Sequence, residues 1–300
     1  MTTPAAAVII CGMATRPPYQ LIDLGGGARL ERFGERIVDR PHPAALGSRH
    51  EVEAWRSADL RYDRDRGWTG PAADAGPWPI ELGGLTLELR PTDAGQLGLF
   101  PEHLAMLPWL TTRVAEAASA SLGVLATERR PLVLHLFAYT GLTTLAMVAA
   151  GPPVTHVDAS RPTVAWARRN ADLSGLADRP IRWIVDDALA FAQREARRAR
   201  RYAGIVLDPP SYGHGPDARA WKLDEDLPRL LAACADVLDP GGFVLLTAHT
   251  PEFDGDRLAE GLCKALARPA RSFERGELAL VTDDGRRLEL GAFARWPGGA

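Results

Sequence analysis

The second half of the chain alternates short apolar segments with helical segments, and this alternation constrains the fold more than any other feature. Apolar strands that alternate with helices predict a mostly parallel sheet with helices on both faces, an α/β fold. Two closing segments, 278–282 and 288–294, flank an Asp283-Asp284-Gly285 turn and predict an antiparallel hairpin at the end of the sheet. The expected strands are 132–137, 154–158, 181–185, 203–208 and 242–248, and the expected helices are 142–150, 162–174, 187–200, 225–238 and 254–267.

The first ninety residues have a different pattern, without long helical periodicity. Residues 19–33 predict two strands around the turn Gly25-Gly26-Gly27, residues 35–41 a third strand, and residues 80–90 another hairpin. Residues 41–75 are expected to be irregular. We therefore expect a small β-rich N-terminal domain over 1–92, a connector and helix over 93–128, and the α/β domain over 129–300. Within the second segment, the connector covers 95–101 and the helix 102–125.

Bulk composition excludes several classes of protein. The net charge of -3 argues against a protein that coats nucleic acid, although it leaves room for a local basic groove. Cys11, Cys234 and Cys263 are far apart, so neither a metal site nor a disulfide framework is indicated. The N-terminus lacks the basic region and the long apolar run of a signal peptide, and no apolar stretch is long enough to span a membrane. We expect a cytoplasmic protein that binds no metal; its oligomeric state stays open.

Ligands of open parallel sheets bind beyond the carboxyl ends of the strands. The loop after the first strand contains only Ala138 and Gly141 as small residues, and the phosphate-binding pattern G-x-G-x-x-G is absent, which disfavours a dinucleotide. Asp158 ends the second strand, where an acidic residue typically binds ribose hydroxyls; capping of the next helix is the alternative. Asp186 or Asp187, after the third strand, is expected to bind an adenine amine while the other carboxylate caps a helix.

The fourth strand ends in Asp208-Pro209-Pro210-Ser211-Tyr212, which is the most specific feature of the chain. Consecutive prolines remove backbone donors and fix the chain direction. A carboxylate and a backbone carbonyl can then both accept hydrogen bonds in one pocket, and the aromatic ring of Tyr212 can stack on a planar group. This set suits an amine, whose hydrogens are held while its nitrogen lone pair stays available for reaction.

Residues 131–248 resemble the class I methyltransferases, and more narrowly the bacterial large-subunit ribosomal RNA base methyltransferases and their uncharacterised relatives. The resemblance is carried by 136–141 (LFAYTG), 157–160 (VDAS), Asn170, 186–188 (DDA), 208–213 (DPPSYG) and the connector 98–102 (GLFPE). It implies S-adenosyl-L-methionine as methyl donor and a ribosomal RNA substrate. It further implies a site in which Asp208, Pro209, Pro210 and Tyr212 face the substrate, and in which the cofactor contacts Phe137, Ala138, Tyr139, Thr140, Gly141, Asp158, Ala159, Asp186, Asp187, Ala188 and Asp208.

Two departures from that family shape the functional hypothesis. No cysteine follows the fourth or fifth strand, so attack on cytosine carbon 5 by a cysteine is disfavoured, and methylation of a base nitrogen fits better. The N-terminal residues match no RNA-binding module that we identify. Methylation of a small molecule or protein, and a degenerate protein that binds the cofactor without transfer, stay as alternatives.

Further residues carry weaker signals. The arginines of 194–201 could bind RNA phosphates or form a solvated helix face. Trp221 and Lys222 could form a lid or anchor the next helix, His249 could be a base, and His103 could close over the cofactor.

Overall fold

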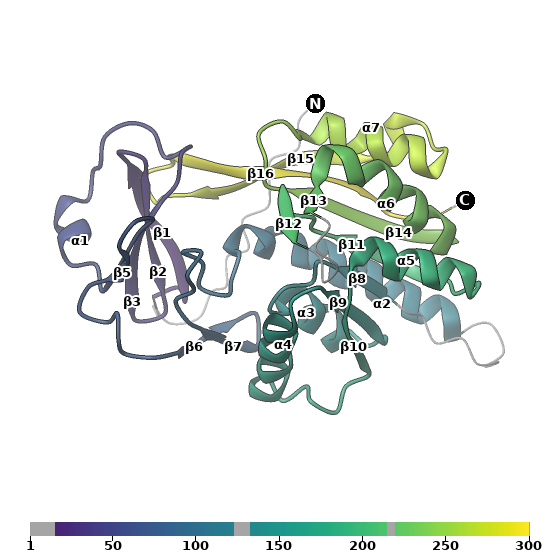
Figure 1. Ribbon diagram of the computed structural model, residues 1–300, viewed down its shortest axis with the longest axis horizontal. Coiled ribbons are helices and arrows are strands. Elements are labelled where there is room, and N and C mark those ends of the chain that lie inside the picture. The colour runs from purple at the N-terminus through teal and green to yellow at the C-terminus, as the bar shows by residue number, and fades with distance from the viewer. Residues whose placement is uncertain (1–15, 123–132, 215–219, 300) are drawn as a thin grey trace.

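The core of the protein is a seven-stranded sheet in the order β10-β9-β8-β11-β14-β16-β15 (Figure 1). In this computed structural model, residues 16–122, 133–214 and 220–299 are described. All neighbouring strands from β10 to β14 are parallel, whereas β16 runs antiparallel to both β14 and β15. The predicted α/β fold with a closing antiparallel hairpin is therefore confirmed. The strands are β8 (Val133–Leu136), β9 (Val154–Asp158), β10 (Ile181–Val185), β11 (Tyr202–Leu207), β14 (Leu238–Ala248), β15 (Glu274–Val281) and β16 (Arg287–Trp296).

Helices cover both faces of this sheet because alternate strand residues point to opposite sides. Leu134 and Leu136 of β8 belong to the core beneath α5, α6 and α7, whereas Val133 belongs to the core beneath α2 and α3. The helix α4 packs along β9 and β10 and against the N-terminal strand β7. The helices are α2 (Leu107–Leu122), α3 (Leu142–Ala149), α4 (Arg161–Leu173), α5 (Ala188–Arg197), α6 (Leu223–Val237) and α7 (Gly255–Leu266).

The N-terminal residues form a second sheet and a separate hairpin, as the sequence predicts. The sheet has the order β1-β2-β3-β4-β5, and the hairpin β6–β7 stands beside it. The segment 41–75, which was expected to be irregular, contains the short helix α1 and the strands β4 and β5. The elements are β1 (Tyr19–Gly25), β2 (Ala28–Phe33), β3 (Arg36–Pro41), α1 (Val52–Arg56), β4 (Leu60–Asp63), β5 (Gly67–Thr69), β6 (Trp78–Leu82) and β7 (Leu85–Leu89).

The N-terminal sheet is tied to the closing hairpin of the central sheet. The long strands β15 and β16 extend towards it (Figure 1), and Leu288 and Leu290 pack against Leu21 and Leu24. Arg286, beyond the end of β15, donates to the buried carboxylate of Asp23 at 2.6 Å. The two sheets are thus joined by apolar burial and by a charged hydrogen bond. The boundaries near residues 92 and 128 stay predictions, and 123–132 lie outside the described residues.

Two connections differ from expectation. The helix expected over 102–125 begins as the 3-10 helix η1 (Pro101–Met106) and continues as α2; residues beyond Leu122 and up to 132 are not described. The loop after Tyr212 contains a small hairpin of β12 (Tyr212–His214) and β13 (Ala220–Lys222). No helix among the described residues is long and apolar enough to cross a membrane.

Candidate functional site

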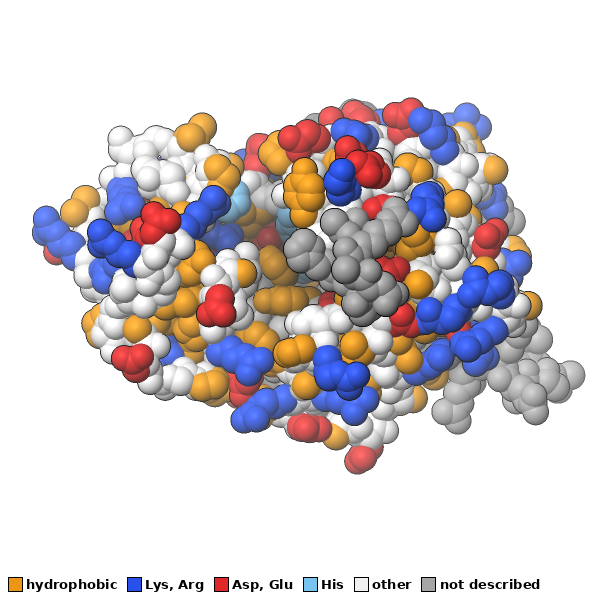
Figure 2. Space-filling model, in the orientation of Figure 1, with side chains coloured by type: hydrophobic (Ala, Val, Ile, Leu, Met, Phe, Trp, Pro, Cys, Tyr) orange, Lys and Arg blue, Asp and Glu red, His pale blue; other side chains and the backbone are white. Residues whose placement is uncertain are grey.

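A cavity lies at the carboxyl ends of β8 and β11, where the fold predicts a ligand site. Its wall combines the connector before η1, the loop after β8, and the ends of β11 and β14. Figure 2 shows that the molecular surface is hollowed between the N-terminal sheet and the central sheet, with histidine side chains in the hollow. The lining includes Gly98, Phe100, His103, His135, Phe137, Ala138, Tyr139, Thr140, Gly141, Asp208 and Thr247.

The loop after β8 has an unusual backbone. Phe137, Tyr139 and Gly141 all have positive φ angles, of 55°, 49° and 94°. Such angles are uncommon for residues with side chains and persist where surrounding contacts enforce them. Asp158 supplies one such contact, since its Oδ2 accepts a hydrogen bond from the Tyr139 amide at 2.9 Å. All five predicted residues of this loop, 137–141, line the cavity.

Two contacts from distant segments hold Thr140. Its hydroxyl donates to the Gly98 carbonyl at 2.5 Å, and its carbonyl accepts from the Asn170 amide at 2.8 Å. Gly98 has a φ of 91°, and a Cβ there would lie 2.2 Å from the Trp166 ring, so only glycine fits. Gly98 and Asn170 are both among the residues that carry the family resemblance. In the structure, each of them positions Thr140.

Asp158 lies at the end of β9, close to the cavity. Its Oδ1 accepts from the Ser160 amide at 2.9 Å, while Ser160, rather than Asp158, caps α4 by accepting from Thr163. Burial raises the pKa of Asp158, although the two backbone hydrogen bonds oppose that effect. The carboxylate therefore has a structural role in the loop, and its oxygens can each accept a further hydrogen bond. Ala159 is exposed beside it.

The structure separates the roles of the two adjacent acids after β10. Asp187 is the N-cap of α5 and accepts from the Ala190 amide at 2.8 Å. Asp186 accepts from the Asp187 amide and is ion-paired with Arg194. Ala188 is buried at the start of the helix. Since Asp187 is the helix cap, Asp186 becomes the better candidate for the adenine contact.

Asp208 lies at the centre of a charged cluster beyond β11. Its Oδ1 accepts from the Thr247 hydroxyl at 2.5 Å and lies 3.1 Å from His249 Nε2. Its Oδ2 lies 3.5 Å from His103 Nε2. Burial raises the pKa of Asp208, but the charges of His103 and His249 and the hydrogen bonds outweigh it and hold the pKa well below its usual range. Asp208 is therefore an ionised acceptor.

His249 is held from both sides of its ring. Its Nδ1 lies 3.0 Å from the Leu290 carbonyl and 3.5 Å from Glu102 Oε1, which orients Nε2 towards Asp208 and His103. Burial lowers the pKa of His249, but Asp208 and then Glu102 and the Leu290 carbonyl raise it to about 9. At neutral pH the ring is consequently an imidazolium that is paired with Asp208.

The sequence did not single out Glu102 or Leu290 as site residues. Glu102 is only 4% exposed, and its Oε2 has no hydrogen-bond partner among the described residues. Phe100 stacks on the His249 ring at 5.7 Å and contacts Tyr139 at 5.1 Å. The signal in the sequence that could have found this support is the connector 98–102, which contains an aromatic and an acidic residue.

The remaining residues of the Asp208 motif have separate environments. Pro209 is buried, and the Pro210 carbonyl accepts from the Trp221 indole at 2.7 Å. Trp221 is itself buried and contacts the Phe137 ring, so it anchors the segment before α6. Tyr212 is 77% exposed and is not among the residues that line the cavity. Its predicted stacking on a substrate stays a prediction.

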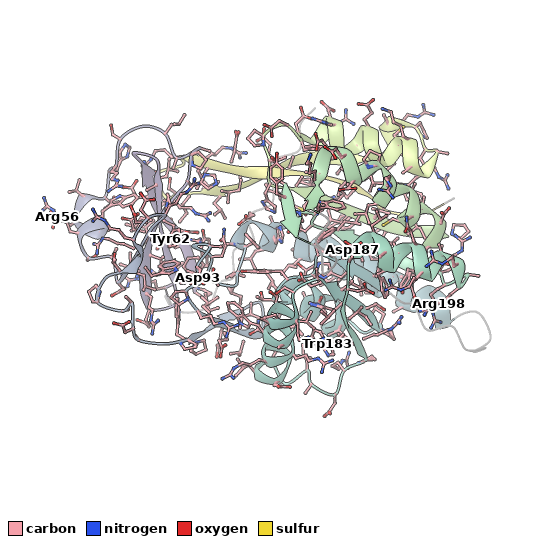
Figure 3. All side chains as sticks on the ribbon, viewed as in Figure 1. Arg56, Tyr62, Asp93, Trp183, Asp187 and Arg198 are labelled. Atoms are coloured by element: carbon pink, nitrogen blue, oxygen red, sulfur yellow. The ribbon has the colours of Figure 1, made fainter. Side chains whose placement is uncertain are left out.

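The arginines of 194–201 lie mostly away from the cavity. Figure 3 shows Asp187 at one end of α5 and Arg198 at the other. Arg198 pairs with Glu195, and Arg201 donates to the Leu238 carbonyl, so part of the group has structural partners. Since Arg201 directly precedes β11, this end of the helix lies at the amino edge of the sheet, opposite the cavity.

Possible ligand atoms of His103, Asp208 and His249 lie within 4.8 Å of one another, close enough to hold a metal ion. The imidazolium–carboxylate pair already satisfies Asp208 Oδ1 and His249 Nε2 without one. His103, Asp208 and His249 thus form a charged hydrogen-bonding cluster.

A family model and a solved structure that are similar to this chain are both described as S-adenosylmethionine-dependent methyltransferases. The family model described as S-adenosylmethionine-dependent methyltransferase matches residues 32–279. The structure is similar to that of the SAM-dependent methyltransferase from Agrobacterium tumefaciens, with a TM-score of 0.84 and 35% identity, covering 98% of this chain and 95% of that one.

Curated relatives include the ribosomal RNA large subunit methyltransferases K/L of two bacteria. The protein from Methylococcus capsulatus is 33% identical over 132 residues, which are 43% of this chain and 18% of the relative. The one from Magnetococcus marinus is 28% identical over 173 residues, 57% of this chain and 22% of the relative. The chain thus spans about a fifth of the length of these relatives.

Proposed function

The chain belongs to the S-adenosylmethionine-dependent methyltransferases, and on this premise we propose that it methylates a nitrogen atom of an RNA base. The observation that carries the proposal is the ionised carboxylate of Asp208 in the cavity, followed by two prolines. An anionic acceptor stabilises the hydrogens of an amine or ring nitrogen, and it stabilises them further as positive charge develops on that nitrogen. The names of the curated relatives support RNA as the acceptor.

The residues around the cavity fit the cofactor that the family uses. When bound, S-adenosylmethionine supplies a methyl group on a positively charged sulfonium. We propose that the loop 137–141 surrounds its methionine part, that Asp158 accepts from the ribose hydroxyls, and that Asp186 accepts from the adenine amine. The left-handed backbone of the loop and the carboxylates at successive strand ends support this assignment.

Asp208 would orient the acceptor rather than remove its proton before the transfer. Its low pKa makes it a weak base, and His249 already carries a proton at neutral pH. A neutral nitrogen needs placement and charge stabilisation more than activation. Thr247 and His249 hold the Asp208 carboxylate in place. The fixed carboxylate would then both orient the acceptor nitrogen and stabilise the positive charge that develops on it.

The described cysteines support a nitrogen rather than cytosine carbon 5 as the target. Cys234 is buried within α6, and burial raises the pKa of its thiol far above the usual value. Cys263 is in α7, with its sulfur 2.7 Å from the Arg268 carbonyl. Neither lies at the end of β11 or β14, where a cysteine nucleophile would be needed. Cys11 lies outside the described residues.

The test is transfer of a labelled methyl group from S-adenosylmethionine to ribosomal RNA from a strain that lacks this gene. We expect nuclease-sensitive label, and nucleoside mass spectrometry should place it on a base nitrogen. Asp208→Asn should lower the turnover rate by about a hundredfold or more, while S-adenosylhomocysteine binding is largely kept. Asp172→Ala, an exposed change on α4, is the control. Label only in protein or small molecules, or binding without transfer, would replace this proposal with an alternative.

A further inference from the structure

The side chains of His103, Asp208 and His249 converge beside the cavity with nearly equal spacing. The two imidazole Nε2 atoms lie 3.1 Å apart, and they lie 3.5 Å and 3.1 Å from Oδ2 and Oδ1 of the Asp208 carboxylate. In a tetrahedral zinc site with bonds of about 2.0–2.2 Å, neighbouring ligand atoms are about 3.4 Å apart. The three side chains are therefore already at the separation that a shared divalent cation requires.

One proton cannot satisfy all three groups. The His249 Nε2 proton is paired with Asp208 Oδ1, and His103 Nε2 approaches the same nitrogen. A protonated His103 Nε2 would direct two N–H groups at each other, whereas an unprotonated one competes with Asp208 for the single proton. A cation between the three side chains removes this competition, because each side chain then offers it a lone pair.

The groups behind the ligand atoms hold them in the form that binds a cation. The Leu290 carbonyl lies 3.0 Å from His249 Nδ1, and Glu102 Oε1 lies 3.5 Å from the same nitrogen. A proton on Nδ1 is thereby stabilised, which leaves Nε2 as the ligand atom; histidines that bind metal ions almost always have such a partner. The Thr247 hydroxyl donates to Asp208 Oδ1 and holds the carboxylate in a comparable way.

The cluster is accessible from the cavity, so that a hydrated cation can reach it. His103 and Asp208 line the cavity, and the side chains of His103, Asp208 and His249 are 14%, 15% and 25% exposed. Figure 2 shows histidine side chains in the hollow between the two sheets. Three protein ligands leave one position of a tetrahedral cation for water.

We propose that His103, Asp208 and His249 bind Zn²⁺, and that the bound cation inhibits methyl transfer. Two imidazole nitrogens and one carboxylate favour zinc over magnesium and calcium, which prefer oxygen ligands. Zn²⁺ would take the place of the His249 Nε2 proton, which is released to solvent. The inhibition rests on the proposed function, since a carboxylate that binds Zn²⁺ is no longer free to orient the acceptor nitrogen; the cation site itself does not depend on it.

The probe for the site is cobalt chloride, titrated into the full chain after removal of metal ions. Co²⁺ binds at zinc sites and has visible absorption bands that report its coordination. We expect saturable binding of one equivalent, which added Zn²⁺ displaces and a large excess of Mg²⁺ does not. His103→Gln should raise the Kd for Co²⁺ by about tenfold or more, because it removes one ligand.

His50→Gln is the matched control for His103→Gln. His50 Nδ1 also lies close to a carboxylate, 3.0 Å from Asp284 Oδ2, but this pair is exposed and is not part of a three-residue cluster. Its loss should leave the Kd for Co²⁺ within about twofold of the wild type. X-ray absorption of the zinc-loaded wild type decides the question if His103→Gln does not fold: we expect two imidazole ligands and no sulfur.

Unsaturable Co²⁺ binding, an equal Kd for the wild type and His103→Gln, or sulfur ligands on the zinc would each overturn the cation site. One equivalent of Zn²⁺ should inhibit methyl transfer to ribosomal RNA, and a chelator should restore it. Full activity with zinc bound, or activity that requires zinc, would overturn the inhibitory role. Co²⁺ binding needs no turnover, so a His103-dependent site in a chain that never methylates RNA would contradict the proposed function alone.

Discussion

The two sides of the cavity are built by different kinds of contact. On the side proposed for the cofactor, several carboxylates bind backbone amides two or three residues away, as Asp158 binds Ser160 and Asp187 binds Ala190, although Thr140 is held from distant segments. On the side proposed for the acceptor, the partners are distant in sequence: His103 and His249 are 146 residues apart. Local contacts follow from strand ends and helix starts, whereas distant contacts depend on how the sheets assemble. The cofactor side is therefore the more predictable from sequence.

Asn170→Ala should have the largest effect, because Asn170 connects the loop after β8 with the N-terminal strand β7. The side chain is fully buried, accepts from the Glu88 amide of β7 at 2.8 Å and donates to the Thr140 carbonyl at 2.8 Å. Removing it leaves two buried backbone groups unsatisfied, so we expect a loss of about 4 kcal/mol in the free energy of unfolding, measured with urea.

Ser174→Ala is the control for Asn170, since Ser174 also connects α4 with β7 through the Thr86 backbone but is only half-buried. Its loss should cost about 1 kcal/mol. If both variants lose the same free energy of unfolding, the hydrogen bonds of Asn170 to β7 and to the loop after β8 are no more important for stability than those of Ser174.

Asp158→Ala should raise the Kd for S-adenosylhomocysteine about a hundredfold. The variant would remove the proposed ribose acceptor and the contact with the Tyr139 amide that holds the loop; hydrogen bonds to charged groups are worth about 1.5–3 kcal/mol each. Calorimetric titration measures the affinity, and circular dichroism checks folding. A Kd within threefold of the wild type would exclude ribose binding by Asp158. Asp172→Ala again serves as the exposed control.

Much of the central sheet could be predicted from sequence. The strands β9 and β10 have the expected bounds because each is a short apolar run between helical segments. The segment 41–75 was missed because α1, β4 and β5 have only five, four and three residues, too few to show periodicity. The sequence predicts one helix over 102–125, whereas the structure has the 3-10 helix η1 followed by α2. The spacing of apolar residues does not distinguish a short 3-10 helix from the first turns of an α-helix.

The candidate site was predicted as separate residues rather than as an arrangement. Asp208 was expected at a strand end, whereas its partners depend on β14 lying next to β11 and on η1 lying against the sheet. Arg29 of β2 is buried, although an arginine in a half-polar hairpin ordinarily faces solvent. Its burial follows from the packing of the N-terminal sheet against the closing hairpin, which no local pattern indicates.

The stability of the wild type should depend on pH through His249, with an effect of about 3 kcal/mol, since one pKa unit corresponds to about 1.4 kcal/mol. The folded pKa is raised to about 9 from an ordinary value of 6.5, so the folded state binds the proton more tightly. The resulting stabilisation is complete below pH 6.5 and is lost as the pH rises through 9. Urea unfolding at pH 6.5 and 9.5 should show this loss in the wild type but not in His249→Gln. The same decrease in both would place the titrating group elsewhere.

Asp187→Ala should have the smallest effect and should separate the two adjacent acids. Loss of an N-cap costs about 1 kcal/mol of stability, and the affinity for S-adenosylhomocysteine should stay within threefold because the Asp187 carboxylate is used by the helix. Asp186→Ala should instead weaken binding about tenfold, with little loss of stability, since its ion pair with Arg194 is partly exposed. Reversed results in calorimetry and urea unfolding would assign the adenine contact to Asp187 and would show that a local cap can also bind the ligand.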